Sequence, residues 1–267
     1  MDTISIVIAV AAIFAASALF SMVGIGGGVL YVPILLALGM SFHDAATSSL
    51  FIIMTTSISA FVIYRRYSLV DWKLALVIEP PTFIMAFVGG LMASQINAVV
   101  LKIVFAAVLI LASFLMIRLV AEKDHIQVRR WGYWRRTLGD TSYVVRLPGL
   151  MPATTLSGFV AGMVGISGGV LKVPSMVLIG NVPMRIAVGT SSLMVAATAL
   201  AGLSGHIIGG SFNVLAVMPM AVAAFFGGRL GSTFSVRVNT VILRKIFAVL
   251  LLAVSAWLIV GEVVRYL

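Results

Sequence analysis

The chain consists of apolar stretches about 20 residues long that follow one another from end to end. An α-helix needs about that many apolar residues to cross the hydrocarbon core of a bilayer, and it satisfies its own backbone hydrogen bonds there. Hydrophobic residues make up 61% of the 267 residues and charged residues only 10%, which is too few to cover the surface of a soluble domain. The sequence therefore predicts an all-α polytopic membrane protein.

Nearly the same segment occurs once in each half of the chain. Residues 21–33 read SMVGIGGGVLYVP, and residues 162–174 read GMVGISGGVLKVP. Two further features follow each copy in the same order, a Thr-Ser-Ser-Leu stretch at 47–50 and 190–193, and a proline with a later glycine pair at 81 and 89–90 and at 219 and 227–228. The order and the spacing indicate that one structural unit is duplicated.

Each unit is expected to contain a helical hairpin followed by three transmembrane helices. The first repeat covers residues 1–120, with a hairpin at 3–39 and helices at 42–64, 72–94 and 98–119. A basic linker at 121–148 leads to the second repeat at 149–267, with a hairpin at 149–180 and helices at 185–207, 213–230 and 240–264. Each repeat therefore has an odd number of helical segments.

The odd number predicts an inverted repeat, because the second copy then enters the membrane from the opposite side. If the central linker is cytoplasmic, 15 of the 18 lysines and arginines fall on the cytoplasmic side. This is the distribution that the positive-inside rule requires. We therefore expect a multi-pass protein of the plasma (inner) membrane, with a cytoplasmic central loop and both termini outside.

The second arm of each hairpin is too short to span the membrane. Residues 29–39 and 170–180 are 11 residues each, about 16 Å of helix against a hydrocarbon core of about 30 Å. We predict two re-entrant hairpins whose glycine-rich tips lie near the midplane. Each tip precedes a helix N-terminus, where free N–H groups and the helix dipole attract an anion. Lys172 adds a full positive charge at a similar depth.

The predicted anion site has backbone, charged and hydroxyl candidates. The substrate-binding candidates are Gly26, Gly27, Gly28 and Tyr31 in the first repeat, Ser167, Gly168, Gly169 and Lys172 in the second, and the hydroxyls of Thr47, Ser48, Thr190 and Ser191. Glu79 is either a protonatable coupling group or a hydrated structural carboxylate. Other interpretations remain open: glycines that serve only helix packing, a lysine that snorkels or pairs with a carbonyl, and hydroxyls that satisfy helix backbone or bond between helices.

Other classes of protein lack the residues that they need. The chain has no cysteine, no Walker sequence and no histidine pair at metal spacing within a span, so we expect no catalytic residue, no metal site and no cofactor. A cation permease would need acids or histidines in the membrane, where this chain has a lysine. The basic and aromatic segment 129–140 is expected to contact lipid headgroups rather than nucleic acid. The expected partners are a small anion, a coupling proton or cation, membrane lipid and a second copy in a homodimer.

The glycines and prolines of the two repeated segments resemble those of the sulfite exporter TauE/SafE family, also called the toluene sulfonate uptake permease family. The matching positions are Gly24, Gly27, Gly28 and Pro33, then Gly165, Gly168, Gly169 and Pro174. The Thr-Ser-Ser-Leu stretches and the paired glycines also match, so the resemblance covers nearly the whole chain. Ser167 departs from the pattern, because the first repeat has Gly26 at this position.

This resemblance implies transport of a small sulfur-containing anion of the sulfite, sulfonate, sulfoacetate or thiosulfate class. We expect a secondary active transporter that binds the anion between the two glycine-rich tips and works by alternating access. A channel-like anion permease is the alternative, and a membrane-embedded enzyme or a metal-cation permease fits the sequence less well. The chain is not expected to be an enzyme.

Overall fold

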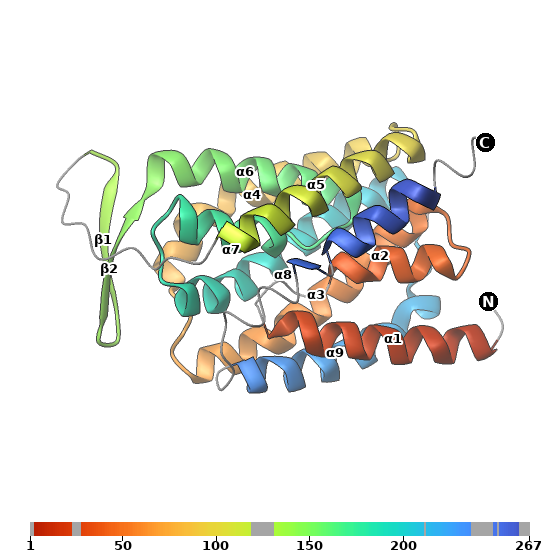
Figure 1. Ribbon diagram of the computed structural model, residues 1–267, viewed down its shortest axis with the longest axis horizontal. Coiled ribbons are helices and arrows are strands. Elements are labelled where there is room, and N and C mark those ends of the chain that lie inside the picture. The colour runs from red at the N-terminus through yellow and green to blue at the C-terminus, as the bar shows by residue number, and fades with distance from the viewer. Residues whose placement is uncertain are drawn as a thin grey trace.

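The computed structural model describes residues 3–22, 28–118, 131–210, 212–235, 248–249 and 251–261. Within these ranges the chain is mainly helical, and Figure 1 shows most helices aligned along the long axis of the molecule. The first half contains α1 (Thr3–Ser21), α2 (Gly28–Ala37), α3 (Phe42–Arg66), α4 (Trp72–Ala93) and α5 (Ala98–Arg118). The second half contains β1 (Tyr133–Leu138), β2 (Thr141–Arg146), α6 (Leu147–Val164), α7 (Gly169–Leu178), α8 (Met184–Gly209) and α9 (Val214–Ser235).

Seven helices in the described part of the chain are long and apolar enough to cross a membrane: α1, α3, α4, α5, α6, α8 and α9. Each lies close to a segment expected from the sequence; α3, for example, starts at the expected residue and extends two residues further. About half of the helix expected at 240–264 lies outside the described residues, and its described parts, 248–249 and 251–261, are helical. The chain is therefore a mostly helical, multi-pass membrane protein, as its composition predicts.

Local sequence determines where several helices begin and end. The hydroxyl of Ser41 accepts a hydrogen bond from the N–H of Asp44 at 3.2 Å and caps α3. Asp71 caps α4 in the same way, through the N–H of Leu74 at 3.0 Å. Gly165 ends α6 in the left-handed region, with φ 73°, as glycine readily does. These caps fix the helix ends around the glycine-rich tip of the second half and the start of α4.

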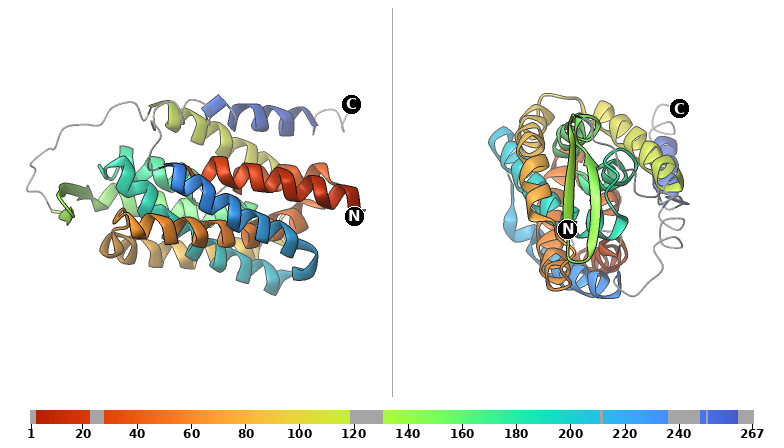
Figure 2. Two further views of the ribbon diagram at one scale, coloured as in Figure 1. Left: turned by 90° about the horizontal axis from the view of Figure 1, so that it is seen from below. Right: turned by 90° about the vertical axis from the view of Figure 1, so that its left-hand side faces the viewer.

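The central linker contains a short β-hairpin, which the sequence did not predict. β1 and β2 pair antiparallel, and Gly139 takes a positive φ of 56° in the turn between them. Tyr143 and Val145 of β2 are buried in an apolar cluster with the starts of α4 and α6. Figure 2 shows the hairpin lying across one end of the helix bundle. The sequence predicted only a basic linker that contacts lipid headgroups. The two strands are stable here because one face of β2 is buried against the helices.

The two halves of the chain pack against each other in matching pairs of helices. α1 packs against α9, and α6, its counterpart in the second half, packs against α4. α3 and α8 contact each other, while α3 also contacts α9 and α8 also contacts α4. The paired glycines permit this close approach: a Cβ on Gly89 would lie 2.1 Å from the carbonyl oxygen of Phe159, and one on Gly227 2.5 Å from that of Phe14. Exchanging the halves thus maps the α1–α9 contact onto α4–α6 and the α3–α9 contact onto α4–α8, and leaves the α3–α8 contact as it is.

The short helices α2 and α7 start beside each other and run toward opposite ends of the molecule. A Cβ placed on Gly28, the first residue of α2, would lie 2.8 Å from the backbone nitrogen of Ser167, just before α7. α7 ends near the β-hairpin, where the carbonyl of Gly180 accepts a hydrogen bond from the last residue of β2 at 3.1 Å. α8 begins at that end, and Phe212, beyond its far end, lines a small cavity together with Met40, which follows α2.

Candidate functional site

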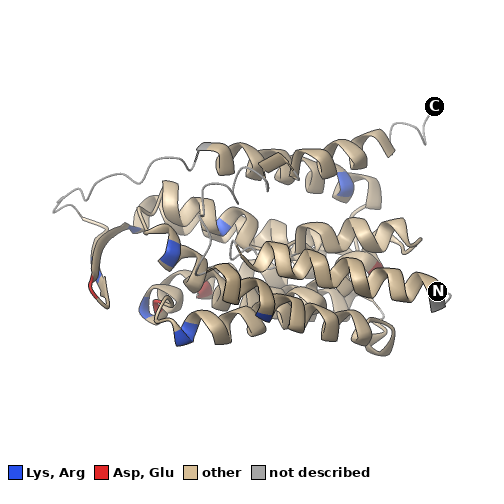
Figure 3. Cartoon of the chain, turned by 60° about the horizontal axis from the view of Figure 1, so that its bottom comes forward, with Lys and Arg blue, Asp and Glu red and all other residues tan. Residues whose placement is uncertain are grey.

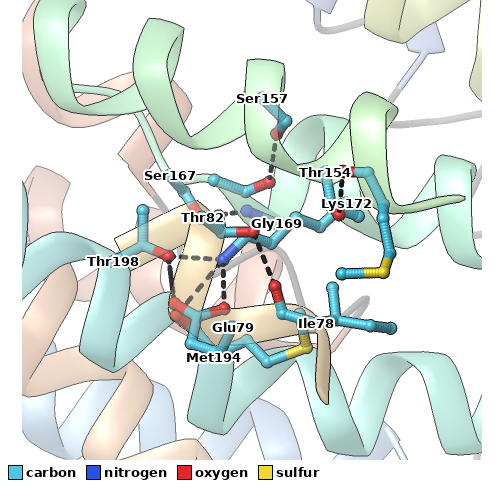
Figure 4. Close-up of polar contacts among 12 residues, drawn as sticks. Ile78, Glu79, Thr82, Thr154, Ser157, Ser167, Gly169, Lys172, Met194 and Thr198 are labelled. Carbon is cyan, nitrogen blue, oxygen red and sulfur yellow. Dashed lines mark hydrogen bonds and ion pairs between the residues drawn. The ribbon is translucent and has the colours of Figure 1, made fainter. Parts of the chain in front are cut away.

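Lys172 lies one turn into α7 and is completely buried. Its ammonium donates a hydrogen bond to Oε2 of Glu79 at 2.8 Å, another to the hydroxyl oxygen of Thr198, and a longer one to the carbonyl of Met194 at 3.4 Å. Figure 4 shows the three groups converging on the ammonium from α4 and α8. An ammonium has three N–H donors, so this arrangement uses all of them.

Glu79 brings a negative charge from the first half of the chain to the positive charge of the second half. Its side chain keeps 13% exposure, whereas that of Lys172 has none. Its other oxygen, Oε1, accepts a hydrogen bond from the hydroxyl of Thr198 at 2.5 Å. The carboxylate is therefore a partner of Lys172. The sequence suggested separate roles for the two residues, anion binding for Lys172 and coupling or a structural role for Glu79. Thr198 was not a candidate, and its position two turns after Thr190 on the same helix was the only sequence signal for it.

Glycine at the start of α7 leaves room for this ion pair. A Cβ on Gly168 would lie 3.4 Å from both Cε of Lys172 and Cγ2 of Thr198. The carbonyl of Gly168 accepts a hydrogen bond from Ser157 at 3.3 Å, and the N–H of Gly169 donates one to the hydroxyl of Ser167 at 3.3 Å. A larger residue at 168 would therefore crowd the charged pair directly.

In the first half, Tyr31 occupies the position that corresponds to Lys172. Its side chain is buried, and its hydroxyl lies 2.7 Å from that of Ser17 and 2.9 Å from that of Thr56. This centre has no formal charge. Of the other candidates in this half, Gly28 lies at the tip, as described above, while Gly26 and Gly27 lie outside the described residues.

Thr47 and Ser48 lie at a separate position, toward the start of α3. The hydroxyl of Thr47 donates to the carbonyl of His43 at 2.8 Å and lies 3.1 Å from Nδ1 of His206. Both side chains line a cavity of about 120 Å³ that also contains Asp44 and Asn213. The structure therefore places these two candidates at a small polar cavity rather than at the Lys172–Glu79 pair.

Thr190 and Ser191 bond to backbone groups near the β-hairpin end. Thr190 accepts a hydrogen bond from the N–H of Asp71 at 2.9 Å, and Ser191 donates one to the carbonyl of Val188, in its own helix, at 2.9 Å. Hydroxyls used in this way satisfy backbone groups in apolar surroundings. Such bonds are also what the alternative interpretation of these hydroxyls requires, and their contact with an anion stays a prediction.

Asp71 is the centre of a second charged cluster, which the sequence did not predict. The guanidinium of Arg136 binds its carboxylate through two nitrogens, at 2.6 and 3.0 Å, and the hydroxyl of Tyr143 donates to it at 2.6 Å. Burial alone would raise the pKa of Asp71, but the hydrogen bonds from Arg136, Tyr143 and the N–H of Leu74, with the charge of Arg136, hold the pKa below its ordinary value. Burial first, and then the neighbouring carboxylate, raise the pKa of the Tyr143 phenol. The cluster fastens the β-hairpin to the start of α4.

The described residues contain no group of three histidine, aspartate or glutamate side chains that could hold a metal ion. The chemistry that they offer is recognition of charge, because an ammonium, a carboxylate, hydroxyls and the N-terminus of a short helix meet at one buried point. Ionisable groups inside a membrane protein are typical of substrate or ion pathways. The fold and this site are those of a multi-pass membrane transporter.

Comparison with known proteins defines the family. The family model described as sulfite exporter TauE/SafE matches residues 9–258, so the chain belongs to this family. YunE of Bacillus subtilis is 28% identical over 90% of this chain and 92% of its own, and YfcA of Escherichia coli K12 is 27% identical over 88% and 82%. A protein of Methanocaldococcus jannaschii is 24% identical over 86% of each chain. All three are named as probable membrane transporter proteins. No solved structure matches the chain significantly.

Proposed function

We propose that this protein is a secondary active transporter of a small sulfur-containing anion of the sulfite, sulfonate, sulfoacetate or thiosulfate class. The substrate class is supported by the description of its family as sulfite exporters. The observation that carries the proposal is that the starts of α2 and α7 meet, with the buried side chain of Lys172 beside the start of α7. Two helix N-termini and one ammonium provide positive potential in a place that water does not screen.

The proposed binding site lies between the two glycine-rich tips. Gly28, Gly168 and Gly169 would bring backbone close to the anion, and Lys172 would supply the charge. Gly26, Gly27, Tyr31 and Ser167 complete the proposed shell, and Thr47, Ser48, Thr190 and Ser191 are proposed to meet the anion only where it enters or leaves. This last role fits their positions toward the two ends of the molecule.

The proposed topology is a pair of inverted repeats with re-entrant hairpins. α2 and α7 have 10 residues each, about 15 Å, which is half of a hydrocarbon core of about 30 Å. Their common starting point and opposite directions support a meeting near the midplane. Figure 3 shows lysines and arginines gathered toward the end that carries the β-hairpin, which supports a cytoplasmic position for that end. Both termini would then face outward.

Alternating access is the proposed mechanism because the packing is nearly the same when the halves are exchanged. Helix pairs that match under this exchange can adopt each other's arrangement, which would open the site to one side and then to the other. Counterflow distinguishes this carrier from a channel. External substrate should accelerate exchange of labelled internal substrate in a carrier but not in an open pore.

The test is binding and uptake by the purified full-length protein. Selective thermal stabilisation by methanesulfonate, thiosulfate or sulfite, but not by acetate, would support the substrate class, because a ligand of the folded state raises its stability. Lys172→Ala should weaken binding about 100-fold, equivalent to about 3 kcal/mol for a hydrogen bond to a charged group, while Lys172→Arg should retain most of it. Lys73→Ala, an exposed lysine of α4, is the matched control. Equal binding by Lys172→Ala and the native protein would remove Lys172 from the site.

A further inference from the structure

The ion pair between Lys172 and Glu79 leaves no free donor for an anion. The three hydrogen bonds of the ammonium go to Glu79, Thr198 and Met194. An anion that binds to Lys172 must therefore displace at least one of these acceptors. Met194 contributes a carbonyl and Thr198 a hydroxyl, so Glu79 is the only one of the three with a negative charge.

Resting on the proposed function, we infer that anion transport by this protein is coupled to one proton, which is carried on Glu79. Two negative groups at one buried ammonium repel each other strongly, because the protein interior screens charge far less than water does. A proton on Glu79 removes this repulsion and leaves the charge of Lys172 for the anion. Proton and anion therefore bind together, and the ion pair re-forms when both have left.

The hydrogen-bond geometry allows Glu79 to be neutral without losing its partner. Oε1 of Glu79 lies 2.5 Å from the hydroxyl of Thr198, which is also 2.9 Å from the carbonyl of Met194. When Glu79 carries a proton, its O–H can donate to the hydroxyl oxygen of Thr198, and Thr198 then donates to the carbonyl of its own helix. Protonation by itself breaks no bond to the lysine protons, so the ammonium keeps its charge and its place until the anion displaces one of the acceptors.

The surroundings of Glu79 contain no competing charged partner among the described residues. α7 contributes Lys172, and α8 contributes Thr198 and the carbonyl of Met194. His206, two turns further along α8, bonds instead to the carbonyl of Gly162 at 2.8 Å. α6, which also packs on α4, brings near the pair the hydroxyls of Thr154 and Ser157, and both bond to backbone carbonyls. Only the carboxylate of the pair has any exposed surface, so it is the group that an incoming proton can reach.

Binding measured against pH tests the coupling in the native protein. The probes are methanesulfonate and thiosulfate, which stay fully ionised between about pH 5.5 and about pH 8, so any pH dependence belongs to the protein. If one proton is taken up with each anion, the dissociation constant rises about tenfold for each pH unit above the range in which Glu79 binds its proton. Glu79→Gln should bind equally well at all of these pH values, whereas the exposed Asp140→Asn at the hairpin turn should behave like the native chain.

Proton movement gives a second measurement that needs no variant. In proteoliposomes of the native protein with a pH-sensitive dye inside, external methanesulfonate should acidify the interior by one proton per anion. This uptake should also be insensitive to membrane potential, because one proton and one monovalent anion carry no net charge. Binding that is constant across the pH range, or uptake without acidification, would overturn the coupling and leave the proposed function standing. Failure of every sulfur-containing anion to bind would overturn both.

Discussion

From the cluster around Asp71 we predict how much the contact between the β-hairpin and the membrane helices contributes to the free energy of unfolding. Asp71→Asn removes the negative charge but keeps a side-chain oxygen for the cap of α4, because asparagine caps helices as well as aspartate does. Arg136 then loses its partner. Breaking a buried ion pair costs about 3–5 kcal/mol, and because Arg136 keeps 12% exposure and can be hydrated, we expect the lower value, about 3 kcal/mol.

Matched variants separate charge from capping in the same cluster. Asp71→Ala should lose about 1 kcal/mol more than Asp71→Asn, because it also removes the cap. Arg136→Gln should resemble Asp71→Asn, and the double variant should be little worse than either single change, since each already breaks the pair. Arg135→Gln, an exposed neighbour on β1, should change the free energy of unfolding by less than about 0.5 kcal/mol.

The assay is unfolding of the detergent-solubilised protein by titration with dodecyl sulfate. The fluorescence of Trp134 reports on the hairpin, because its ring lies 4.5 Å from the guanidinium carbon of Arg136. The pKa of Asp71 is lower in the folded than in the unfolded protein, so its contribution is complete above the unfolded pKa of about 3.9 and is lost as the pH falls through the folded value. The difference between native and Asp71→Asn proteins should therefore shrink below about pH 4. Equal stability of the two at pH 7, or a difference that does not change on acidification, would refute the reasoning.

Two glycines offer further predictions about backbone strain and close packing. Gly165→Ala should destabilise the protein by about 3 kcal/mol, because φ is 73° there and the new Cβ would lie 2.4 Å from the Cα of Ala46. Gly39→Ala has a similar φ of 84° but open space around the new Cβ, so it should lose only about 1 kcal/mol. Equal losses of the two variants in the dodecyl sulfate titration would contradict this. Gly90→Ala should lose about 1–3 kcal/mol, because its Cβ would lie 2.3 Å from the carbonyl oxygen of Gly202. Gly261→Ala, which meets nothing within 4 Å, should show no loss, and the prediction fails if the two variants unfold alike.

Much of the helical arrangement could be predicted because the length of an apolar segment, and the residues that begin or end a helix, are local properties of the sequence. Ser41 and Asp44, which stand just before and inside the first turn of α3, have the form of a capping box, and in the structure Ser41 caps this helix. The β-hairpin was missed because its arginines and aromatic residues suit a lipid surface equally well. The signal was present in Gly139 and Asp140, a turn pair between two six-residue runs.

The polar centre could be predicted only in part. The depth of Lys172 follows from its distance to the glycines, but its partner depends on how α4 is rotated and which helix it packs against. Glu79 is 93 positions away in the sequence, and Thr198 lies on a third helix. Periodicity within one helix contains no information on such distant contacts, so their pairing required the packed structure.

The difference between Tyr31 and Lys172 has a consequence for the resting state of the protein. Exchanging the two halves would change few helix contacts, but it would change the buried polar centres. The centre around Tyr31 is neutral, whereas the one around Lys172 contains a salt bridge. In the alternating-access mechanism proposed above, the inward-open and outward-open forms would then differ in free energy even between identical solutions. With no gradient and no substrate, one of them should dominate the population. A single substitution at either position would be enough to alter that preference.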